Sequence, residues 1–419
     1  MANNPEKAIL IGLILQDNTN FEIDEQLDEL ELLAETAGAT TVSRIVQQRT
    51  KIEPATYIGK GKINSVISQA KELDCKLLVF NDEISPTQIK NVQNLAGEDL
   101  KILDRTGLIL DIFRKHAKTR EAKTQVELAH LNYMLPRLTR QWTHLERQMG
   151  GIGTTGGPGE KQIEIDRRLI RNQISKLKKD LEKIERQRDT QSENRKSAFN
   201  ISLVGYTNAG KSTLMNALTN ADVYVEDQLF ATLDTTTRKM IFDSQKNTNI
   251  LLSDTVGLIR KLPHDLVASF RSTLSEVSKA DFILKVLDAS SPTIKDHLET
   301  IDSVLISLNS DQIPSQIVLN KVDMIQEPGL INGLKKRFPK AILISARKHL
   351  KLDQLQGCIS NEFHKKLKKY TFHLAYSQCG ILDKIYSSFE VLSREDNEEN
   401  ISITVFGREA IINSILAKL

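Results

Sequence analysis

The chain has 419 residues, 40% of them hydrophobic and 26% charged, and its formal net charge at pH 7 is +3. This composition is ordinary for a globular protein and excludes a wholly disordered chain, while the length exceeds what one hydrophobic core usually supports, so about two to four domains are expected. The three cysteines, Cys75, Cys358 and Cys379, are widely scattered, which suggests neither a disulfide framework nor a zinc site and fits a reducing cytoplasm.

Short apolar runs alternate with amphipathic stretches from residue 8 to residue 116, a pattern typical of an α/β domain. The run AILIGLIL, residues 8–15, is too short for a membrane span and lacks the flanks of a signal peptide, so it indicates a buried first strand. The stretch YIGKGK, residues 57–62, resembles part of a phosphate loop but lacks its closure and its hydroxyl. A turn that opens a helix from Lys62 is therefore preferred over a nucleotide site.

Two helices joined by a glycine-rich stretch are expected next. Residues 119–148 are polar and permit a long helix, which Pro136 should bend. From Ile170 onward, isoleucines and leucines recur at spacings of four and three, the pattern of a coiled-coil seam, so a second helix should fold back on the first. The stretch GGIGTTGGPGE, residues 150–160, then lies at the hairpin tip, without the strand and helix that a phosphate cradle needs.

Basic residues gather around this hairpin. Between residues 160 and 196 there are twelve Lys/Arg against eight Asp/Glu, and further basic clusters lie at residues 137–147 and 365–369. Such a cluster indicates either a solvated helix surface or contact with an acidic partner, and the charge alone does not decide between them.

A phosphate loop is found at residues 199–218, FNISLVGYTNAGKSTLMNAL, which contain G-x-x-x-x-G-K-S between a strand-like run and a helix. Backbone N–H groups from Asn208 to Ser212 can surround the β-phosphate, Lys211 can bridge β- and γ-oxygens, and the Ser212 hydroxyl can bind Mg²⁺. The motif predicts a nucleotide-binding domain, which an ATPase or a small-molecule kinase would also have.

Later motifs indicate which nucleotide base the domain binds and which reaction it catalyses. The stretch LLSDTVG ends with D-x-x-G, in which Asp254 can hold Mg²⁺ through water and the Gly257 N–H can sense the γ-phosphate. FATLDTTTR contains Thr232, a hydroxyl that can close on Mg²⁺ only when the γ-phosphate is present. The position after D-T-V-G is Leu258, where many switch GTPases carry a glutamine that positions water. We therefore expect slow hydrolysis by the protein alone.

The stretch IVLNKVD supplies N-K-x-D, whose Asp323 carboxylate can accept two hydrogen bonds from guanine but finds no such pair of donors on adenine. Lys321 can cover the base, Asn320 can tie its loop to the phosphate loop, and the Ala346 N–H of LISAR can meet guanine O6. These motifs predict a GTPase and argue against a metabolic kinase.

The candidate site therefore has three parts. The catalytic residues are Lys211, Thr232 and Gly257; the Mg²⁺ ligands are Ser212 and Thr232, with Asp254 through water; and Asn208 resembles the asparagine of potassium-stimulated GTPases. The predicted nucleotide-binding residues are Gly205, Tyr206, Thr207, Asn208, Ala209, Gly210, Lys211, Ser212, Phe230, Ala231, Thr232, Leu233, Asp234, Asp254, Thr255, Val256, Gly257, Asn320, Lys321, Val322, Asp323, Ser345, Ala346 and Arg347.

With these motifs in hand, the chain resembles the HflX family of translational GTPases over nearly its whole length. The stretches DRTGLILDIF, EAKTQVELAHLNYMLPRL and GGIGTTGGPGEKQIEIDRR are similar to the family's amino-terminal signature. The resemblance implies an α/β multidomain protein: an N-terminal α/β domain (residues 1–117), a helical hairpin (118–197) with its tip at 150–159, a Ras-like P-loop GTPase domain (198–368) and a small C-terminal α/β module (369–419), which reads as strand, helix, strand, helix.

The resemblance also implies a cytoplasmic, monomeric factor that binds the large ribosomal subunit and dissociates stalled or idle ribosomes under stress. The glycine tip would then face ribosomal RNA, with phosphates held by basic residues, namely Lys161, Arg167, Arg168 and Arg171; a plain linker is the alternative. A second functional hypothesis is a GTP-regulated RNA-binding module, or a partner of an RNA-modifying enzyme, that does not split ribosomes.

Overall fold

The structure is a computed structural model that describes residues 5–16, 19–138, 160–192, 198–219, 229–230, 236–240, 249–260, 276–397 and 400–417. The chain forms two compact units. The first comprises Met1–Ile184 together with Glu226–Asp234 and Ile259–Ser272, and the second comprises Glu185–Val225, Thr235–Leu258 and Thr273–Leu419.

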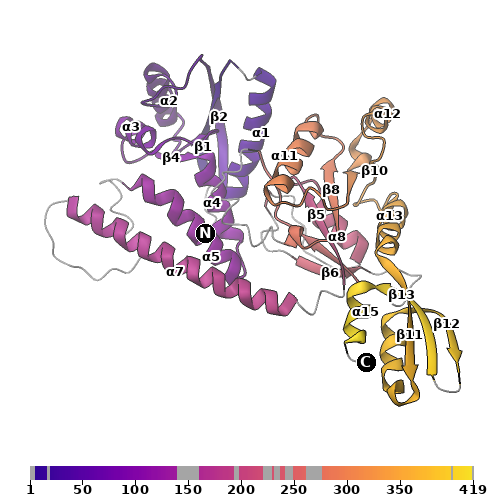
Figure 1. Cartoon of the computed structure of the whole chain (residues 1–419). Helices are drawn as coiled ribbons and strands as arrows, with labels where there is room; N and C mark the ends of the chain where they lie inside the picture. Colours follow the sequence, from indigo (N-terminus) through magenta and orange to yellow (C-terminus); the bar gives the residue numbers. More distant parts are fainter. Residues whose placement is uncertain are drawn as a thin grey trace. The chain divides into compact units, whose positions relative to one another are not determined.

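A four-stranded parallel sheet organises the first unit, in the order β2-β1-β3-β4. Helices α1 and α4 lie on one face of the sheet, and α2 and α3 pack on the other (Figure 1). The elements are β1 (Glu6–Ile14), α1 (Asn20–Ala37), β2 (Ala39–Gln48), α2 (Lys60–Glu72), β3 (Leu77–Phe80), α3 (Pro86–Ala96), β4 (Lys101–Asp104) and α4 (Arg105–His116). The central strand β1 is the predicted buried first strand, because its side chains from Ala8 to Ile11 are fully enclosed.

Local sequence sets where these helices begin. Thr19 and Glu22 form a capping box at α1, and Ser85 and Gln88 form another at α3. The stretch YIGKGK is a turn that opens a helix, as predicted, but α2 begins at Lys60, two residues earlier than expected. Its N-cap is a glycine whose N–H donates to a glutamine side chain of β2 at 2.9 Å.

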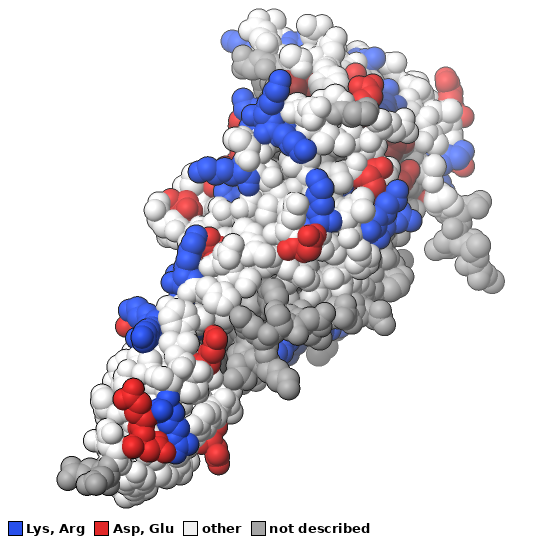
Figure 2. All heavy atoms as spheres, turned by 90° about the vertical axis from the view of Figure 1, so that its right-hand side faces the viewer, with Lys and Arg blue, Asp and Glu red and all other residues white. Residues whose placement is uncertain are grey.

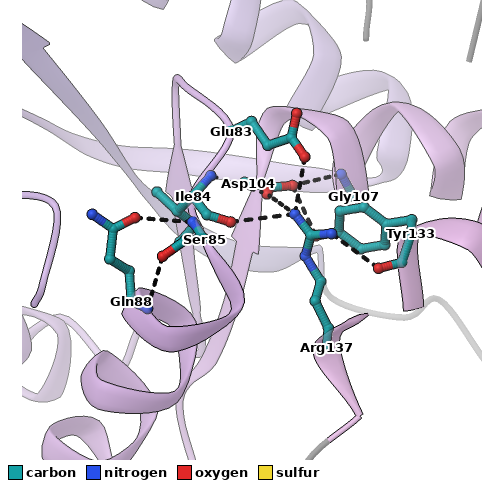
Figure 3. Close-up of polar contacts among 8 residues, drawn as sticks. All are labelled: Glu83, Ile84, Ser85, Gln88, Asp104, Gly107, Tyr133 and Arg137. Atoms are coloured by element: carbon teal, nitrogen blue, oxygen red, sulfur yellow. Dashed lines mark hydrogen bonds and ion pairs between the residues drawn. The ribbon is translucent and has the colours of Figure 1, made fainter. Parts of the chain in front are cut away.

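A buried carboxylate joins the sheet to the first helix of the hairpin. Asp104, at the end of β4, is fully buried, caps α4 through the Gly107 N–H at 2.8 Å and accepts from the Tyr133 hydroxyl at 2.8 Å (Figure 3). Arg137 donates to the same carboxylate at 3.3 Å and to the Ile84 carbonyl at 3.2 Å, and its guanidinium lies 3.7 Å from the Tyr133 ring centroid. Burial raises the pKa of Asp104, while these donors and the guanidinium oppose the rise.

The inclusion of Arg137 in an exposed basic cluster is therefore wrong, because this side chain is 7% exposed and holds the hairpin base. The first hairpin helix is α5 (Arg120–Met134), followed by a 3-10 turn, η1 (Leu135–Arg137). The helix thus ends before Pro136 instead of bending through it. Residues 139–159, with the predicted glycine tip, lie outside the described residues.

The second hairpin helix, α7 (Glu160–Ser192), packs on the first through the predicted seam. Ile170 and Ile174 are buried in one cluster with two leucines of α5 and with Leu138, the residue after η1, and Leu177 and Leu181 pack against it. The four-three spacing therefore predicted the folding back of α7 correctly, since it aligns one apolar stripe with the preceding helix.

The second unit is built on a six-stranded sheet in the order β10-β9-β8-β5-β7-β6, in which only β6 runs antiparallel to its neighbour. Its elements are β5 (Phe199–Gly205), α8 (Lys211–Thr219), β6 (Thr236–Met240), β7 (Ile250–Asp254), β8 (Phe282–Asp288), α11 (Ile294–Ser307), β9 (Ser315–Asn320), η3 (Val322–Met324), α12 (Pro328–Arg337), β10 (Ile342–Leu343) and α13 (Leu352–Lys365). Since parallel strands end at one edge, this order brings the ends of β5, β7, β8 and β9 together.

An antiparallel three-stranded sheet, β11-β13-β12, forms the end of the chain. Its elements are β11 (Leu367–Ala375), η4 (Tyr376–Ile381), α14 (Leu382–Ser388), β12 (Glu390–Asp396), β13 (Asn400–Arg408) and α15 (Glu409–Leu416). The expected order of strand, helix, strand, helix is wrong by one strand, because β12 and β13 form a hairpin. The α/β multidomain fold class is confirmed.

Candidate functional site

The phosphate loop runs from the end of β5 to the start of α8, and its glycines are required by close contacts. A Cβ on Gly205 would lie 2.2 Å from the Val286 carbonyl oxygen of β8. Gly210 has φ +86° and a Cβ there would lie 2.3 Å from the Asn320 amide nitrogen. Both positions therefore exclude a side chain, the first for lack of space and the second also by its backbone conformation.

Lys211, the first residue of α8, is buried beneath this loop at 7% exposure. Its ammonium group donates to the carbonyls of Gly205 at 3.1 Å and Tyr206 at 2.9 Å. Burial lowers the pKa of Lys211 to about 8, and the nearby Asp254 carboxylate only partly opposes that change. The side chain is thus a cation held on weak carbonyl partners, which phosphate oxygens can replace.

Ser212 and Asp254 meet at the position where a Mg²⁺ ligand set is expected. The Ser212 hydroxyl donates to Asp254 Oδ2 at 2.6 Å, and Asp254 is fully buried at the end of β7. A hydroxyl and a carboxylate are the hard oxygen donors that Mg²⁺ prefers, so these residues fit the ion. When bound, Mg²⁺ neutralises charge on the β- and γ-oxygens.

The D-x-x-G segment is fastened to the phosphate loop through its backbone. The Thr207 N–H donates to the Leu258 carbonyl at 2.8 Å, and the Leu258 N–H donates to the Gly205 carbonyl at 3.0 Å. A Cβ on Gly257 would lie 2.7 Å from Thr207 Cγ2 and 3.2 Å from Lys211 Nζ. Gly257 thus lies directly beside the lysine that is expected to hold the phosphates.

Asn320, at the end of β9, links two loops with one amide. Its Nδ2 donates to the Ala209 carbonyl of the phosphate loop at 2.9 Å, and its Oδ1 accepts from the Ala346 N–H at 2.9 Å. The Ala346 N–H expected to meet guanine O6 is therefore engaged by Asn320 in this structure. Ser345 is fully buried beside it.

Asp323 and Lys321 follow Asn320 and lie where a base is expected. A hydrogen bond from the Ser345 side chain lowers the pKa of Asp323, which keeps the carboxylate ionised and accepting. Lys321 adopts a left-handed conformation at φ 61°, and its ammonium lies 2.9 Å from Asp288 Oδ2 and 3.3 Å from Asn208 Oδ1. The oxygen of Asn208 suggested for K⁺ thus already accepts from an ammonium group.

Not every predicted residue joins this group. The Phe230 ring is 3% exposed and packs edge-on against Phe113 of α4, with ring centroids 4.7 Å apart, so its side chain is used for packing within the first unit. Residues 231–234, with the expected switch threonine Thr232, lie outside the described residues.

Two residues near the site escaped the sequence analysis. The imidazole of His297 in α11 stacks on the Tyr206 ring, with centroids 3.9 Å apart and planes at 16°. Asp288 at the end of β8 holds Lys321. Its place after an apolar strand could have indicated a site residue, whereas a single histidine in an amphipathic helix carries no such signal.

Three family models match the chain. The one described as GTP-binding GTPase N-terminal covers residues 24–114, the GTP-binding GTPase Middle Region covers 116–195, and the 50S ribosome-binding GTPase covers 200–321. Together these matches extend over more than half of the chain.

Similar proteins named GTPase HflX include one from Caldanaerobacter subterraneus subsp. tengcongensis, 42% identical over 96% of this chain and 91% of its own length. Another, from Escherichia coli strain K12, is 38% identical over 97% of this chain and 94% of its own. Among solved structures, a GTP-binding protein from Sulfolobus solfataricus in complex with GDP is 25% identical, with a TM-score of 0.44, over 85% of this chain and 98% of that one.

Proposed function

Since the chain belongs to the HflX family of GTPases and hydrolyses GTP, we propose that it is a ribosome-associated factor that uses GTP to bind the large ribosomal subunit. Under stress, it dissociates stalled or idle ribosomes into subunits. It acts in the cytoplasm as a monomer.

Asn320 provides the main support for the nucleotide part of this proposal. Its side chain links the loop that is expected to hold the base to the loop that is expected to hold the phosphates. Asp323 selects guanine by accepting from two base donors, Lys211 holds the phosphates, and Ser212 and Asp254 hold Mg²⁺. The candidate switch elements Thr232 and Gly257 respond to the γ-phosphate. Adenine nucleotides bind weakly, because they offer Asp323 no such pair of donors.

Hydrolysis by the protein alone is slow in this proposal. Leu258 stands where a polar, water-positioning side chain is needed, and it is 2% exposed with its backbone bonded to the phosphate loop. A leucine can neither donate nor accept, so the ribosome supplies or reorders the missing group. Completing a GTPase site in this way can raise the rate by about 10⁵.

The ribosomal part rests on the description of the family model that matches residues 200–321, a 50S ribosome-binding GTPase. It also rests on the hairpin of α5 and α7, whose base is fastened to the sheet by Asp104 and Arg137. A fastened hairpin can present the glycine-rich stretch to RNA at a defined place, and bare backbone there allows close approach.

Ribosome co-sedimentation tests this proposal. The protein is incubated with whole ribosomes and either GDP or a non-hydrolysable GTP analogue, and free subunits are counted after gradient centrifugation. We expect binding and subunit release with the analogue and little with GDP. Binding without subunit release would favour the second candidate, a GTP-regulated RNA-binding module, for which the basic surface of α7 is the supporting observation.

A monovalent cation is a further part of the proposal. Asn208 holds a left-handed conformation at φ 57°, which aims its side chain at Lys321 in this structure. With nucleotide bound, its oxygen is free to accept K⁺ if Lys321 moves over the base. Hydrolysis should then be slower when Na⁺ replaces K⁺, and equal rates in the two salts would remove K⁺ from the proposal.

A further inference from the structure

A ring contact beside the phosphate loop joins a residue outside the predicted site to one within it. The surface drawn in Figure 2 has Lys and Arg interspersed with Asp and Glu, so its charge does not single out a further binding site. The interior is more informative. The imidazole of His297 lies nearly parallel to the Tyr206 ring, with centroids 3.9 Å apart and planes at 16°. Tyr206 is the second residue of the phosphate loop and is 6% exposed, so the stack joins α11 to the loop that is expected to hold the phosphates.

The sequence of α11 explains why His297 faces this loop. Ile294, Ile301 and Leu305 are buried and form the apolar side of the helix, which packs against β8 and β5 (Figure 1). At about 100° per residue, His297 lies within about 60° of that side. It belongs to the first turn after β8, and the phosphate loop begins at the same edge of the sheet, at the end of the neighbouring strand β5. Helical spacing therefore places a half-buried ring against the loop.

The backbone of Tyr206 lies where three parts of the site meet. Its carbonyl accepts from the Lys211 ammonium at 2.9 Å and from the Ala209 N–H at 3.2 Å. Tyr206 also forms an isolated parallel bridge with Leu258, the residue after D-T-V-G. The ring and the carbonyl share one Cα, so a ring held in place limits the rotation of the peptide group. The stack thus fixes an acceptor of Lys211 from outside the loop.

We propose that His297 is a positioning residue for nucleotide binding, which holds the phosphate loop in its binding conformation by stacking on Tyr206. This inference rests on the proposed role of Lys211 in holding the phosphates. It adds a residue that lies in none of the nucleotide-binding motifs. The imidazole transfers no proton in this role, because only its flat face contacts Tyr206. Another aromatic ring at position 297 is therefore sufficient, whereas a small side chain is not.

The strength of the stack sets the size of the effect. Aromatic pairs contribute an amount that corresponds to about 2–12-fold in an equilibrium constant, beyond the area that they bury. The stack changes affinity only as far as it favours the conformation that binds the ligand. Without it, the Tyr206 peptide group gains freedom, which must be lost again when GDP binds. We therefore expect GDP affinity to fall by about 3–10-fold when the ring is removed.

Three variants of the full-length protein test this role. His297→Ala removes the ring, and His297→Phe keeps an aromatic ring without its nitrogen atoms. His364→Ala is the control, because it removes a half-buried histidine of another helix in the same unit, α13, whose Nδ1 lies 2.6 Å from the Ser360 carbonyl oxygen. Urea unfolding without nucleotide is measured beside GDP affinity, so that a loss of stability is distinguished from a loss of binding.

Titration calorimetry with GDP gives the first readout. His297→Ala should bind GDP about 3–10-fold more weakly than the natural protein, and the other two variants should stay within about twofold of it. Proton uptake at pH 8, measured in two buffers, gives the second. A looser loop admits water to Lys211, which raises its pKa from about 8 toward 10.5, so uptake should fall in His297→Ala and be restored in His297→Phe.

The proposal is wrong if His297→Ala binds GDP as tightly as the natural protein, even when its stability falls, since the stack would then serve only the fold. It is also wrong if His297→Phe is as weak as His297→Ala, or if the control loses as much affinity. Uptake unchanged by His297→Ala would contradict an effect that acts through Tyr206 on Lys211.

If His297→Ala does not fold, His297→Leu replaces it with the same expectations, because leucine fills the space without an aromatic face. Lys211→Ala tests the premise separately. Unchanged GDP binding in Lys211→Ala would contradict the proposed function of that lysine. A loss in Lys211→Ala with none in His297→Ala would contradict only the inference about His297.

Discussion

Nucleotide binding should take up protons at alkaline pH, because burial lowers the pKa of Lys211 to about 8, so that near and above this pH the lysine is partly neutral in the free protein. Its ammonium lies on two backbone carbonyls. The phosphates of GDP bring several negative charges to the same place, which favours the charged form and raises the pKa again. Binding at a pH near or above 8 therefore draws a proton from the buffer.

The size of the effect follows from the pKa. With a pKa of about 8, uptake per GDP should be about 0.1 proton at pH 7, 0.5 at pH 8 and 0.9 at pH 9. The lowering from 10.5 corresponds to about 3 kcal/mol against the charged form. The pKa of Lys211 is lower in the folded than in the unfolded protein. The penalty is therefore present in full below pH 8 and disappears as the pH rises toward 10.5, so the free energy of unfolding increases between these two pH values.

Calorimetry in two buffers of different ionisation enthalpy measures the uptake directly. The second phosphate ionisation, near pH 6, contributes less and less above pH 7, whereas the Lys211 contribution grows. Lys211→Arg is the control, since a guanidinium stays charged throughout and should show no rise in uptake from pH 7 to 9. Absent uptake at pH 9 in the natural protein would refute the reasoning, as would equal uptake by the arginine variant.

Three further outcomes are expected. Asp323→Asn should weaken GTP binding and improve binding of xanthosine triphosphate in a competition assay, because the amide can pair with the 2-oxo group; an unchanged preference for GTP would remove the base assignment. Gly210→Ala should weaken GDP binding by at least about tenfold, since a left-handed alanine near Asn320 stores about 1–3 kcal/mol; near-normal titration calorimetry would contradict this. Asp104→Asn should lower stability to urea by about 3 kcal/mol, because the buried Arg137 charge then keeps only the exposed Glu83 carboxylate, 3.2 Å away, as its acidic partner, with GTP affinity intact; an unchanged urea midpoint would argue against the Asp104–Arg137 pair.

Much of this protein could be predicted because its strong signals are local. The phosphate loop is a contiguous motif and can be recognised without its surroundings, although the contacts that exclude side chains at Gly205 and Gly210 come from Val286 of β8 and Asn320 of β9. The seam of α7 could be read from spacing alone, since the apolar residues of a hairpin must share one side. In both cases one contiguous segment of the sequence contains the pattern from which its structure can be predicted.

Other features depend on partners that are distant in sequence. From the sequence alone, Arg137 resembles a surface cation. In the structure it is buried because it donates to Asp104, which lies on another element. The strand β12 is charged and exposed along most of its length, so its sequence resembles a loop, and only pairing with β13 makes it a strand. The ring of His297, in α11, stacks on the ring of Tyr206, which follows β5 and lies about ninety residues earlier in the sequence. No single segment contains the information for these placements.

The double role of the Asn320 amide has a consequence for nucleotide exchange. Since one side chain supports the loop around the phosphates and the loop beside the base, neither loop can open without loosening the other. We expect GDP to leave in one concerted event, and fragments of the nucleotide to bind much more weakly than their separate contacts suggest. An exchange factor acting on either end would release the whole ligand.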